Sequence, residues 1–198
     1  MSEASETIGT RRWFWPEDLT AHRVSLRAML IASIEDEGIL GYGDEITDAD
    51  GDAFADELAR GLRDGSTHVL LGEDDSGVFA MCVMRRPAMA NCRHLAEVSK
   101  AYLAPRARGS GAVLELALAV AERLTWIGVE RIQIDVREHS HAHRVWRGLG
   151  FETFGVLDDY SRYGGARHRG HFMTVTVPDL LRNTRTRIGR RRQTADTP

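Results

Sequence analysis

The segment formed by residues 96–128 constrains the fold of this chain more strongly than any other. A β-prone run at residues 97–104 leads into a short loop that contains Gly109 and Gly111, and an apolar helical run follows at residues 113–127. Glycines let a backbone approach a ligand closely, and the first N–H groups of a helix are unpaired donors at the positive end of its dipole. This order of strand, glycine loop and helix is typical of a site that binds phosphate.

Length and charge limit the class of protein. A chain of 198 residues is long enough for one well-buried domain and too short for two ordinary ones. The net charge of −3 argues against nucleic acid as the main partner. Cys82 and Cys92 do not make a disulfide framework, and no apolar run has the length of a signal-peptide core or a membrane span. We therefore expect a cytoplasmic protein with no nucleic-acid or membrane partner, and the sequence leaves a homodimer open.

Composition shifts divide the chain into three parts. Residues 1–9 are mostly small and polar, and we expect them to be disordered. We expect residues 10–178 to form one domain. Residues 179–198 carry six arginines without clear apolar periodicity, which is typical of a basic, disordered tail.

Local patterns predict strands and helices on both sides of the glycine loop. A Pro-Glu-Asp sequence favours a helix start after the first strand, and two β-rich runs flank an acidic turn at residues 73–77 as in a hairpin. Strands are predicted at residues 10–15, 67–71, 78–84, 131–136, 151–157 and 171–177, and helices at residues 16–37, 48–65 and 140–149.

The order and spacing of residues in and after the loop carry a family resemblance. Arg108, Gly109 and Gly111 form an R-G-x-G sequence shortly after a strand, and Gly128 follows Arg108 by 20 positions (128 − 108 = 20). Together with L-G-F-E at residues 149–152, this pattern resembles the GNAT superfamily of acyl-CoA-dependent N-acetyltransferases, from about residue 92 to residue 177. The motifs R-H-x-A-E-V-x-K, from Arg93, and D-x-R-x-x-S, from Asp135, are most similar to the tabtoxin-resistance type.

The resemblance implies both a fold and an activity. The implied fold class is α/β (α+β), with a mostly antiparallel, splayed central sheet flanked by helices. The implied activity moves an acetyl group from acetyl-CoA to a primary amine of a small molecule, by direct attack in a ternary complex and without a metal. The tabtoxin-resistance motifs point to an amino-acid-like or antibiotic acceptor, and so to antibiotic resistance or biosynthesis.

The resemblance also assigns residues to the acetyl-CoA site. Loop N–H groups would hold the pyrophosphate, and the strand backbone at Tyr102 and Leu103 would line the pantetheine arm and polarise the thioester carbonyl. Val113 stands where the family has Gly or Ala, and its β-branch would loosen the cradle or shift it by one residue. His139 replaces the usual Asn before the short helix. The full predicted cofactor set is Tyr102, Leu103, Arg108, Gly109, Ser110, Gly111, Ala112, Val113 and His139.

Three residues are candidates for the chemistry. Glu97 lies where several relatives carry a catalytic glutamate, and a partly buried carboxylate there would serve as the base; an exposed or salt-bridged strand residue is the alternative. Asp135 is the second candidate, with a helix-capping role as its alternative. Trp146 stands where many relatives place a Tyr that protonates the sulfur, and an indole is not a useful acid. A thiol with a pKa of about 8.5 can leave as thiolate, and Tyr160, Tyr163 or Tyr102 could supply the acid instead.

Acceptor recognition is expected from the more variable parts of the chain. The acidic cluster that begins at Glu35 would attract a cationic amine, and Tyr160 and Tyr163 lie on the closing hairpin that borders the acceptor cleft in relatives. His139, His141 and His143 are too closely spaced for all three to share a helix face, and we expect no metal site. Two other functions remain open: a non-catalytic acyl-CoA-binding or regulatory module, and a protein or peptide N-acetyltransferase.

Overall fold

The central feature of the computed structural model, which describes residues 11–36, 40 and 45–195, is a seven-stranded sheet. Its strand order is β1-β2-β3-β4-β5-β7-β6, and every neighbouring pair is antiparallel except β4 and β5. The predicted α+β class with a mostly antiparallel, splayed sheet is therefore confirmed. The strands are β1 (Arg12–Phe14), β2 (Thr67–Asp74), β3 (Gly77–Arg85), β4 (Leu95–Leu103), β5 (Arg131–Arg137), β6 (Glu152–Tyr163) and β7 (Ala166–Thr176).

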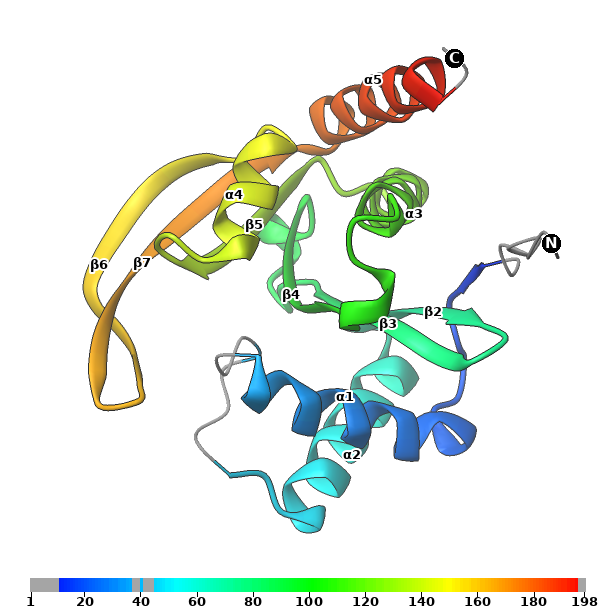
Figure 1. The fold of residues 1–198 in the computed structure, drawn as a ribbon, viewed down its shortest axis with the longest axis vertical. Helices are drawn as coiled ribbons and strands as arrows, with labels where there is room; N and C mark the ends of the chain where they lie inside the picture. Colours follow the sequence, from blue (N-terminus) through cyan, green and yellow to red (C-terminus); the bar gives the residue numbers. More distant parts are fainter. Residues whose placement is uncertain (1–10, 37–39, 41–44, 196–198) are drawn as a thin grey trace, which may run out of the picture.

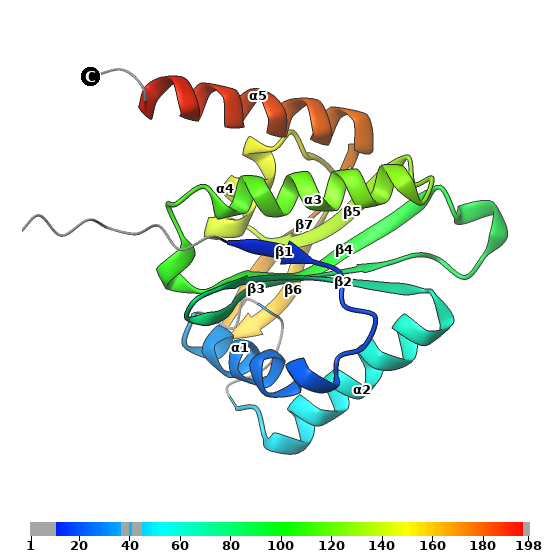
Figure 2. The ribbon, with the colours of Figure 1, turned by 90° about the vertical axis from the view of Figure 1, so that its right-hand side faces the viewer.

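Helices cover both faces of this sheet. Helices α1 (Arg23–Glu35) and α2 (Asp48–Asp64) lie against one face, and α3 (Ala112–Trp126) and α5 (Val177–Ala195) lie on the other side (Figures 1 and 2). Each layer has its own buried core, one centred on α3 and β5 and the other on α1, α2 and β2. Short elements complete the chain: α4 (His141–Gly148) and the 3-10 turns η1 (Thr20–His22), η2 (Ala90–Cys92) and η3 (Pro105–Ala107).

A bulge in β4 creates the opening on which the site depends. Met81 and Val83 of β3 pair with Tyr102 and Ser99, so β4 carries one extra residue at this point, and Lys100 adopts a positive φ of 48°. An extra residue reverses the alternation of side chains and bends the strand. Pairing of β4 with β5 stops at Glu97, so the two strands diverge beyond it.

The basic C-terminal segment differs from the prediction. We expected residues 179–198 to be a disordered tail, but the described part forms α5, which packs on α3. Leu180 and Thr184 are fully buried, and Leu181 and Ile188 are half-buried on the same side. These residues recur at helical spacing and form the narrow face by which α5 packs on the rest of the protein. The arginines around them make this apolar pattern hard to recognise in the sequence.

Two further expectations concern the chain as a whole. The predicted disorder of residues 1–9 lies outside the described residues. Among the helices that the structure describes, none is both long and apolar enough to cross a membrane.

Candidate functional site

Two cavities meet where β4 and β5 separate. We call one of about 590 Å³ the loop cavity, because Gly109 and Gly111 of the glycine loop line it, and one of about 700 Å³ the hairpin cavity, because residues 160–163 of β6 line it. Both cavities share part of their lining. A ligand in either one would therefore reach the same junction, which is formed by Ala101, Arg137, Ser140, Ala142 and Trp146.

The loop cavity offers backbone donors to an anion. Gly109 and Gly111 have φ of 73° and 92°, a region that glycine adopts without strain, and Gly111 is the N-cap of α3. No side chain caps this helix, and its first backbone bonds run from Leu114 and Glu115 to the Gly111 carbonyl. In the described part of the chain, the N–H groups of residues 109–113 have no acceptor, whereas that of Arg108 donates to the Pro105 carbonyl. The N–H groups of residues 109–113 are free donors at the positive end of the α3 dipole.

The arginines of the loop itself do not provide the expected free charge. Arg108 lines the loop cavity, but its Nη1 donates to Asp36 Oδ1 at 3.2 Å, its Nη2 donates to the other oxygen of Asp36, and its Nε donates to the Leu103 carbonyl at 3.0 Å. The hydrogen bond that Arg108 donates to Asp36 raises the pKa of Arg108. Arg106 is paired with Asp74 through a single nitrogen, Nη1. The prediction missed both pairs because the aspartates come from distant parts of the chain.

The other predicted cofactor residues divide into two groups. Tyr102, Leu103, Val113 and His139 line the loop cavity together with Gly109 and Gly111, and α3 begins at Ala112 in spite of the β-branch of Val113. Ser110 and Ala112 do not line it. The Ser110 hydroxyl donates to the Ala107 carbonyl and accepts from Arg11, and Ala112 is fully buried beneath the loop.

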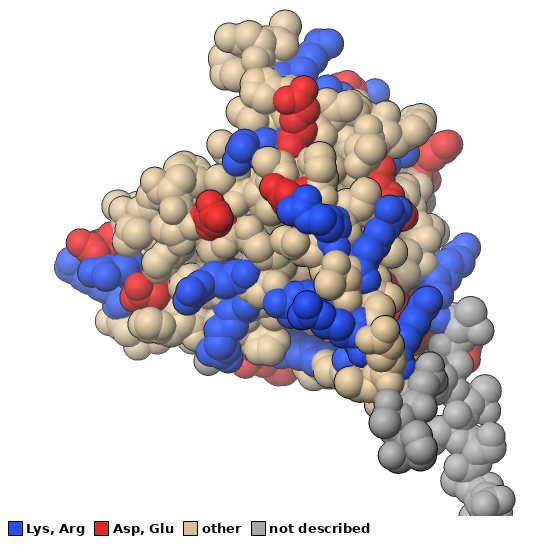
Figure 3. All heavy atoms as spheres, turned by 90° about the horizontal axis from the view of Figure 1, so that it is seen from above, with Lys and Arg blue, Asp and Glu red and all other residues tan. Residues whose placement is uncertain are grey.

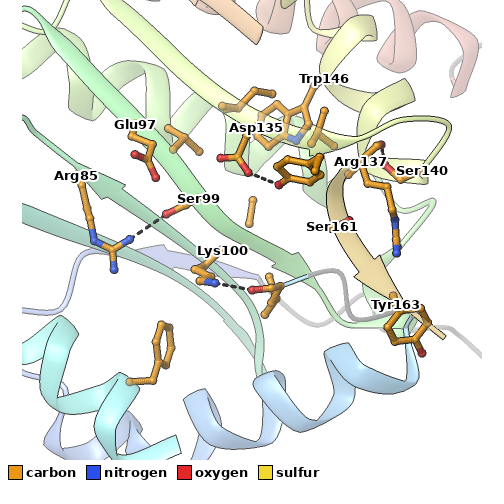
Figure 4. A pocket seen from close by; sticks show the side chains of 18 of the residues that line it. Arg85, Glu97, Ser99, Lys100, Asp135, Arg137, Ser140, Trp146, Ser161 and Tyr163 are labelled. Atoms are coloured by element: carbon orange, nitrogen blue, oxygen red, sulfur yellow. Dashed lines mark hydrogen bonds between the residues drawn. The ribbon is translucent and has the colours of Figure 1, made fainter. Parts of the chain in front are cut away.

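Two carboxylates face the hairpin cavity. Ala96 and Val98 pack into the core on the α3 side, so Glu97 projects from the opposite face, and the parallel register places Asp135 on that same face. Figure 4 shows both side chains beside the opening. The Tyr160 hydroxyl donates a hydrogen bond to Asp135. Burial, and then this hydrogen bond, raise the pKa of Tyr160 well above its usual range, so Tyr160 stays a donor.

Glu97 differs from the prediction in its exposure. We expected a partly buried carboxylate, but the side chain is exposed because β5 diverges from β4 immediately beyond it. Within the described residues, its carboxylate has neither a hydrogen bond nor an ion pair, including with Lys100 or Arg93. Glu97 is therefore a free anionic group at the wall of the hairpin cavity.

Cationic side chains line the same cavity. Arg85 Nη2 donates to Glu57 at 2.8 Å and its Nη1 to the Ser99 hydroxyl at 3.1 Å. Lys100 donates to the Leu40 carbonyl, and burial, followed by the charge of Arg85, lowers the pKa of Lys100. The hairpin cavity thus presents both signs of charge within one enclosure, which suits a ligand that itself carries both.

Trp146 places an indole at the junction, where the family resemblance would lead one to expect the phenol of a tyrosine. Trp146 packs edge-on against Phe151 with ring centroids 5.1 Å apart and lines both cavities. Tyr160 and Tyr163 line only the hairpin cavity, and the Tyr163 hydroxyl donates to the Ile34 carbonyl at 3.1 Å. The Tyr102 hydroxyl is buried without a partner among the described residues. Neither Tyr160 nor Tyr163 therefore has an uncommitted proton for the junction.

Glu35, a predicted acceptor residue, and His143, from the closely spaced histidines, line neither cavity. Glu35 is an exposed residue, whereas Asp36, the next residue, lines the loop cavity. His143 is buried and stacks on His171 at 4.5 Å. In residues 11–36, 40 and 45–195, no group of three or more potential ligands could hold a metal. Sequence reasoning also missed Arg187 and Arg191 of α5, which line the loop cavity.

These features define the class of fold. A splayed parallel pair, with a glycine loop and an uncapped helix on one side, is the GNAT acetyltransferase fold, and comparison with solved structures bears this out. The chain matches no protein-family model, and no curated protein matches its sequence.

The similar structures include three acetyltransferases, and each likeness shows the fold alone. A ribosomal-protein-alanine N-acetyltransferase from Brucella melitensis is 22% identical, with a TM-score of 0.69 over 84% of this chain and 99% of that one. A GNAT superfamily phosphinothricin acetyltransferase from Sinorhizobium meliloti, in complex with AcCoA, is 22% identical, with a TM-score of 0.70 over 85% and 88%. A spermidine N-acetyltransferase from Vibrio cholerae, in complex with CoA and spermine, is 14% identical, with a TM-score of 0.70 over 86% and 98%.

Proposed function

We propose that this chain is an N-acetyltransferase that moves an acetyl group from acetyl-CoA to a primary amine of a small molecule. The meeting of two chemically different cavities at one junction carries this proposal. The loop cavity offers donors for phosphates, and the hairpin cavity offers carboxylates for an amine. Direct transfer requires both substrates to be bound at once with their reacting atoms adjacent, and Trp146 marks the point where they would meet.

The residues of the loop cavity fit acetyl-CoA. The unpaired N–H groups before Leu114 would hold the pyrophosphate, and the glycines at 109 and 111 leave room for it. Beyond Glu97, β4 has no strand partner on its β5 side, so its backbone is free to pair with the amides of the pantetheine arm. Acetyl-CoA supplies an activated acyl group as a thioester. A β4 N–H group at the junction would polarise its carbonyl.

The acceptor amine would bind beside the two carboxylates. Glu97 has no competing partner in the described structure and attracts the ammonium form, and we assign it the role of base, directly or through one water. Asp135, held by Tyr160, fixes the orientation of the amine. Trp146 would donate a hydrogen bond at the junction, and the sulfur, with a thiol pKa of about 8.5, leaves as thiolate without an acid.

The walls of the hairpin cavity favour a small acceptor over a peptide. The bond from Tyr163 to Ile34 ties the end of β6 to the end of α1 and closes one side. Mixed charges from Arg85, Lys100 and Glu97 suit an amino-acid-like molecule, in agreement with the tabtoxin-resistance motifs and the likeness to a phosphinothricin acetyltransferase. Because the fold is also similar to that of a spermidine N-acetyltransferase, polyamines should be tested as acceptors alongside amino acids.

A substrate screen with one active-site variant tests the proposal. Amino acids, polyamines and short peptides are each incubated with acetyl-CoA, and release of free thiol is measured. We expect turnover with an amino-acid-like amine and little with peptides. Glu97→Gln should lower kcat about 100-fold or more at neutral pH, since a positioned base contributes that much, with acetyl-CoA affinity nearly unchanged. Glu130→Gln, an exposed glutamate outside both cavities, is the matched control.

Other outcomes would redirect the proposal. Full activity of Glu97→Gln would transfer the base role to Asp135 or to water. Acetyl-CoA binding without turnover of any amine would favour a non-catalytic acyl-CoA-binding module. Faster turnover of peptides than of small amines would favour a peptide N-acetyltransferase.

A further inference from the structure

Helix α5 concentrates positive charge on one side of the molecule. It carries six arginines and one aspartate. Two of the arginines are paired with carboxylates, Arg182 with Asp179 and Arg185 with Glu122. Figure 3 shows Lys and Arg side chains gathered in a row over the face that α5 helps to form.

Two of the remaining arginines of α5 line the loop cavity. Arg187 and Arg191 are four residues apart, so they lie on one side of the helix, one turn from each other. In the described structure, neither has a carboxylate within ion-pair distance. They therefore bring unneutralised charge to a cavity whose own loop arginines, Arg106 and Arg108, are neutralised by aspartates.

Their contacts place them at the phosphate end of the cavity. Arg191 Nη2 donates to the Gly109 carbonyl at 2.8 Å, and a Cβ added at Gly111 would lie 3.1 Å from its Nε. Arg187 lies beside the end of α4, where a Cβ added at Gly148 would be 3.4 Å from its Nη2. The two guanidinium groups thus extend from the glycine loop towards α4, beyond the N–H groups that open α3.

Acyl-CoA carries more phosphate than the loop alone would hold. The N–H groups at the start of α3 suit the pyrophosphate, which leaves the 3′-phosphate, a dianionic group, without a partner. A phosphate monoester is best bound by guanidinium groups, which make charge-assisted hydrogen bonds. We propose that Arg187 and Arg191 bind the 3′-phosphate of acyl-CoA, and this inference rests on the proposed function.

The consequence is a selective donor site. The 3′-phosphate distinguishes free CoA thioesters from acyl groups carried on a bare phosphopantetheine arm, which lacks the nucleotide. With α5 in place, the protein binds free CoA thioesters more tightly than acyl groups on a bare phosphopantetheine arm. A helix that we had expected to be a disordered tail thus becomes a determinant of donor specificity.

A comparison of two donors tests the proposal. Dissociation constants are measured by calorimetry for acetyl-CoA and for 3′-dephospho-acetyl-CoA. The unaltered protein should bind acetyl-CoA at least about tenfold more tightly, which corresponds to about 1.4 kcal/mol. In the double variant Arg187→Gln/Arg191→Gln, this ratio should fall to about one, through weaker binding of acetyl-CoA. The matched control is Arg190→Gln/Arg192→Gln, two exposed arginines of the same helix that line neither cavity, and it should keep the ratio.

The ratio separates recognition from a structural role. If Arg191 only held the glycine loop in shape, the double variant would bind both donors more weakly and the ratio would stay the same, which would overturn the proposal. The proposal would also be overturned if the ratio of dissociation constants fell to about one in the control variant Arg190→Gln/Arg192→Gln. The preference for acetyl-CoA would then come from the overall positive charge of α5. Failure of the unaltered protein to bind either donor would instead reject the proposed function itself.

Discussion

At the scale of single residues, the hairpin cavity, where we propose that the acceptor binds, depends on the absence of a side chain at Gly170. This residue lies in β7 opposite Arg137, and a Cβ added there would be 2.1 Å from Cγ of Tyr160. The Tyr160 side chain therefore occupies the space that a β-carbon at residue 170 would fill. That position allows its hydroxyl to reach Asp135.

Gly170→Ala should dislodge Tyr160 from Asp135. We expect a loss of stability of about 1–3 kcal/mol, because the added methyl overpacks a filled site, together with a raised KM for the amine. Chemical denaturation and steady-state kinetics measure the two effects. Gly164→Ala, in the hairpin turn where a Cβ meets no other atom, controls for the loss of a glycine, although its positive φ of 57° adds some strain of its own. Unchanged kinetics in Gly170→Ala would mean that Tyr160 does not orient the acceptor.

At the scale of elements, local patterns predicted the centre of the fold. The predicted strand at 97–104, helix at 113–127 and strand at 131–136 correspond closely to β4, α3 and β5, because each has a strong apolar period and a glycine boundary. The β6 strand, predicted to end at 157, continues to Tyr163. Its polar outer half is held by pairing with β7 and by the hydroxyls of Tyr160 and Tyr163, which no local pattern reveals.

The parts of the site that the sequence did not predict arise from tertiary contacts. Asp36 and Arg108 are 72 positions apart, and their pairing follows from where α1 ends relative to the glycine loop. The bulge in β4 shows itself only through its register with β3. Helix α5 was not predicted because its buried face is narrow and is stabilised only by its contact with α3.

Helix α5 yields a stability prediction of its own. Leu180 is 1% exposed and lies between α5 and the core that surrounds α3, so Leu180→Ala should destabilise the protein by about 2–5 kcal/mol. Arg190→Ala, on the exposed side of the same helix, should change stability by no more than about 0.5 kcal/mol. Chemical denaturation measures both variants. Equal, small effects would show that α5 is not docked in solution.

At the scale of the whole molecule, stability should fall on acidification. Burial lowers the pKa of His143, and the charges of His171, Arg147 and His139 act in the same direction, against Glu138. The unfolded chain then binds the proton more readily than the folded chain below about pH 6.5. The contribution of His143 is therefore fully present above that pH and is lost as pH falls towards the lowered pKa, by at most about 1.4 kcal/mol per pH unit.

Thermal unfolding between about pH 7.5 and pH 5 tests this prediction. The midpoint should decrease with pH in the unaltered protein and decrease less steeply in His143→Gln. The pKa of the half-buried His68 is also lowered by burial, so part of the dependence of the midpoint on pH remains in both the unaltered protein and His143→Gln. His141→Gln, at an exposed histidine of the same helix, should leave the slope as it is. Parallel slopes in the unaltered protein and His143→Gln would contradict the assignment.

The most direct test of the whole proposal is the thermal unfolding midpoint with and without saturating acetyl-CoA. Ligand at about one hundred times its dissociation constant stabilises a protein by about 2.7 kcal/mol, which for a domain of this size raises the midpoint by roughly 5–10 °C. We predict a rise of this size with acetyl-CoA and none with acetate at the same concentration. An unchanged midpoint at millimolar acetyl-CoA would show that the loop cavity does not bind the donor, and the proposed acetyl transfer would fail with it.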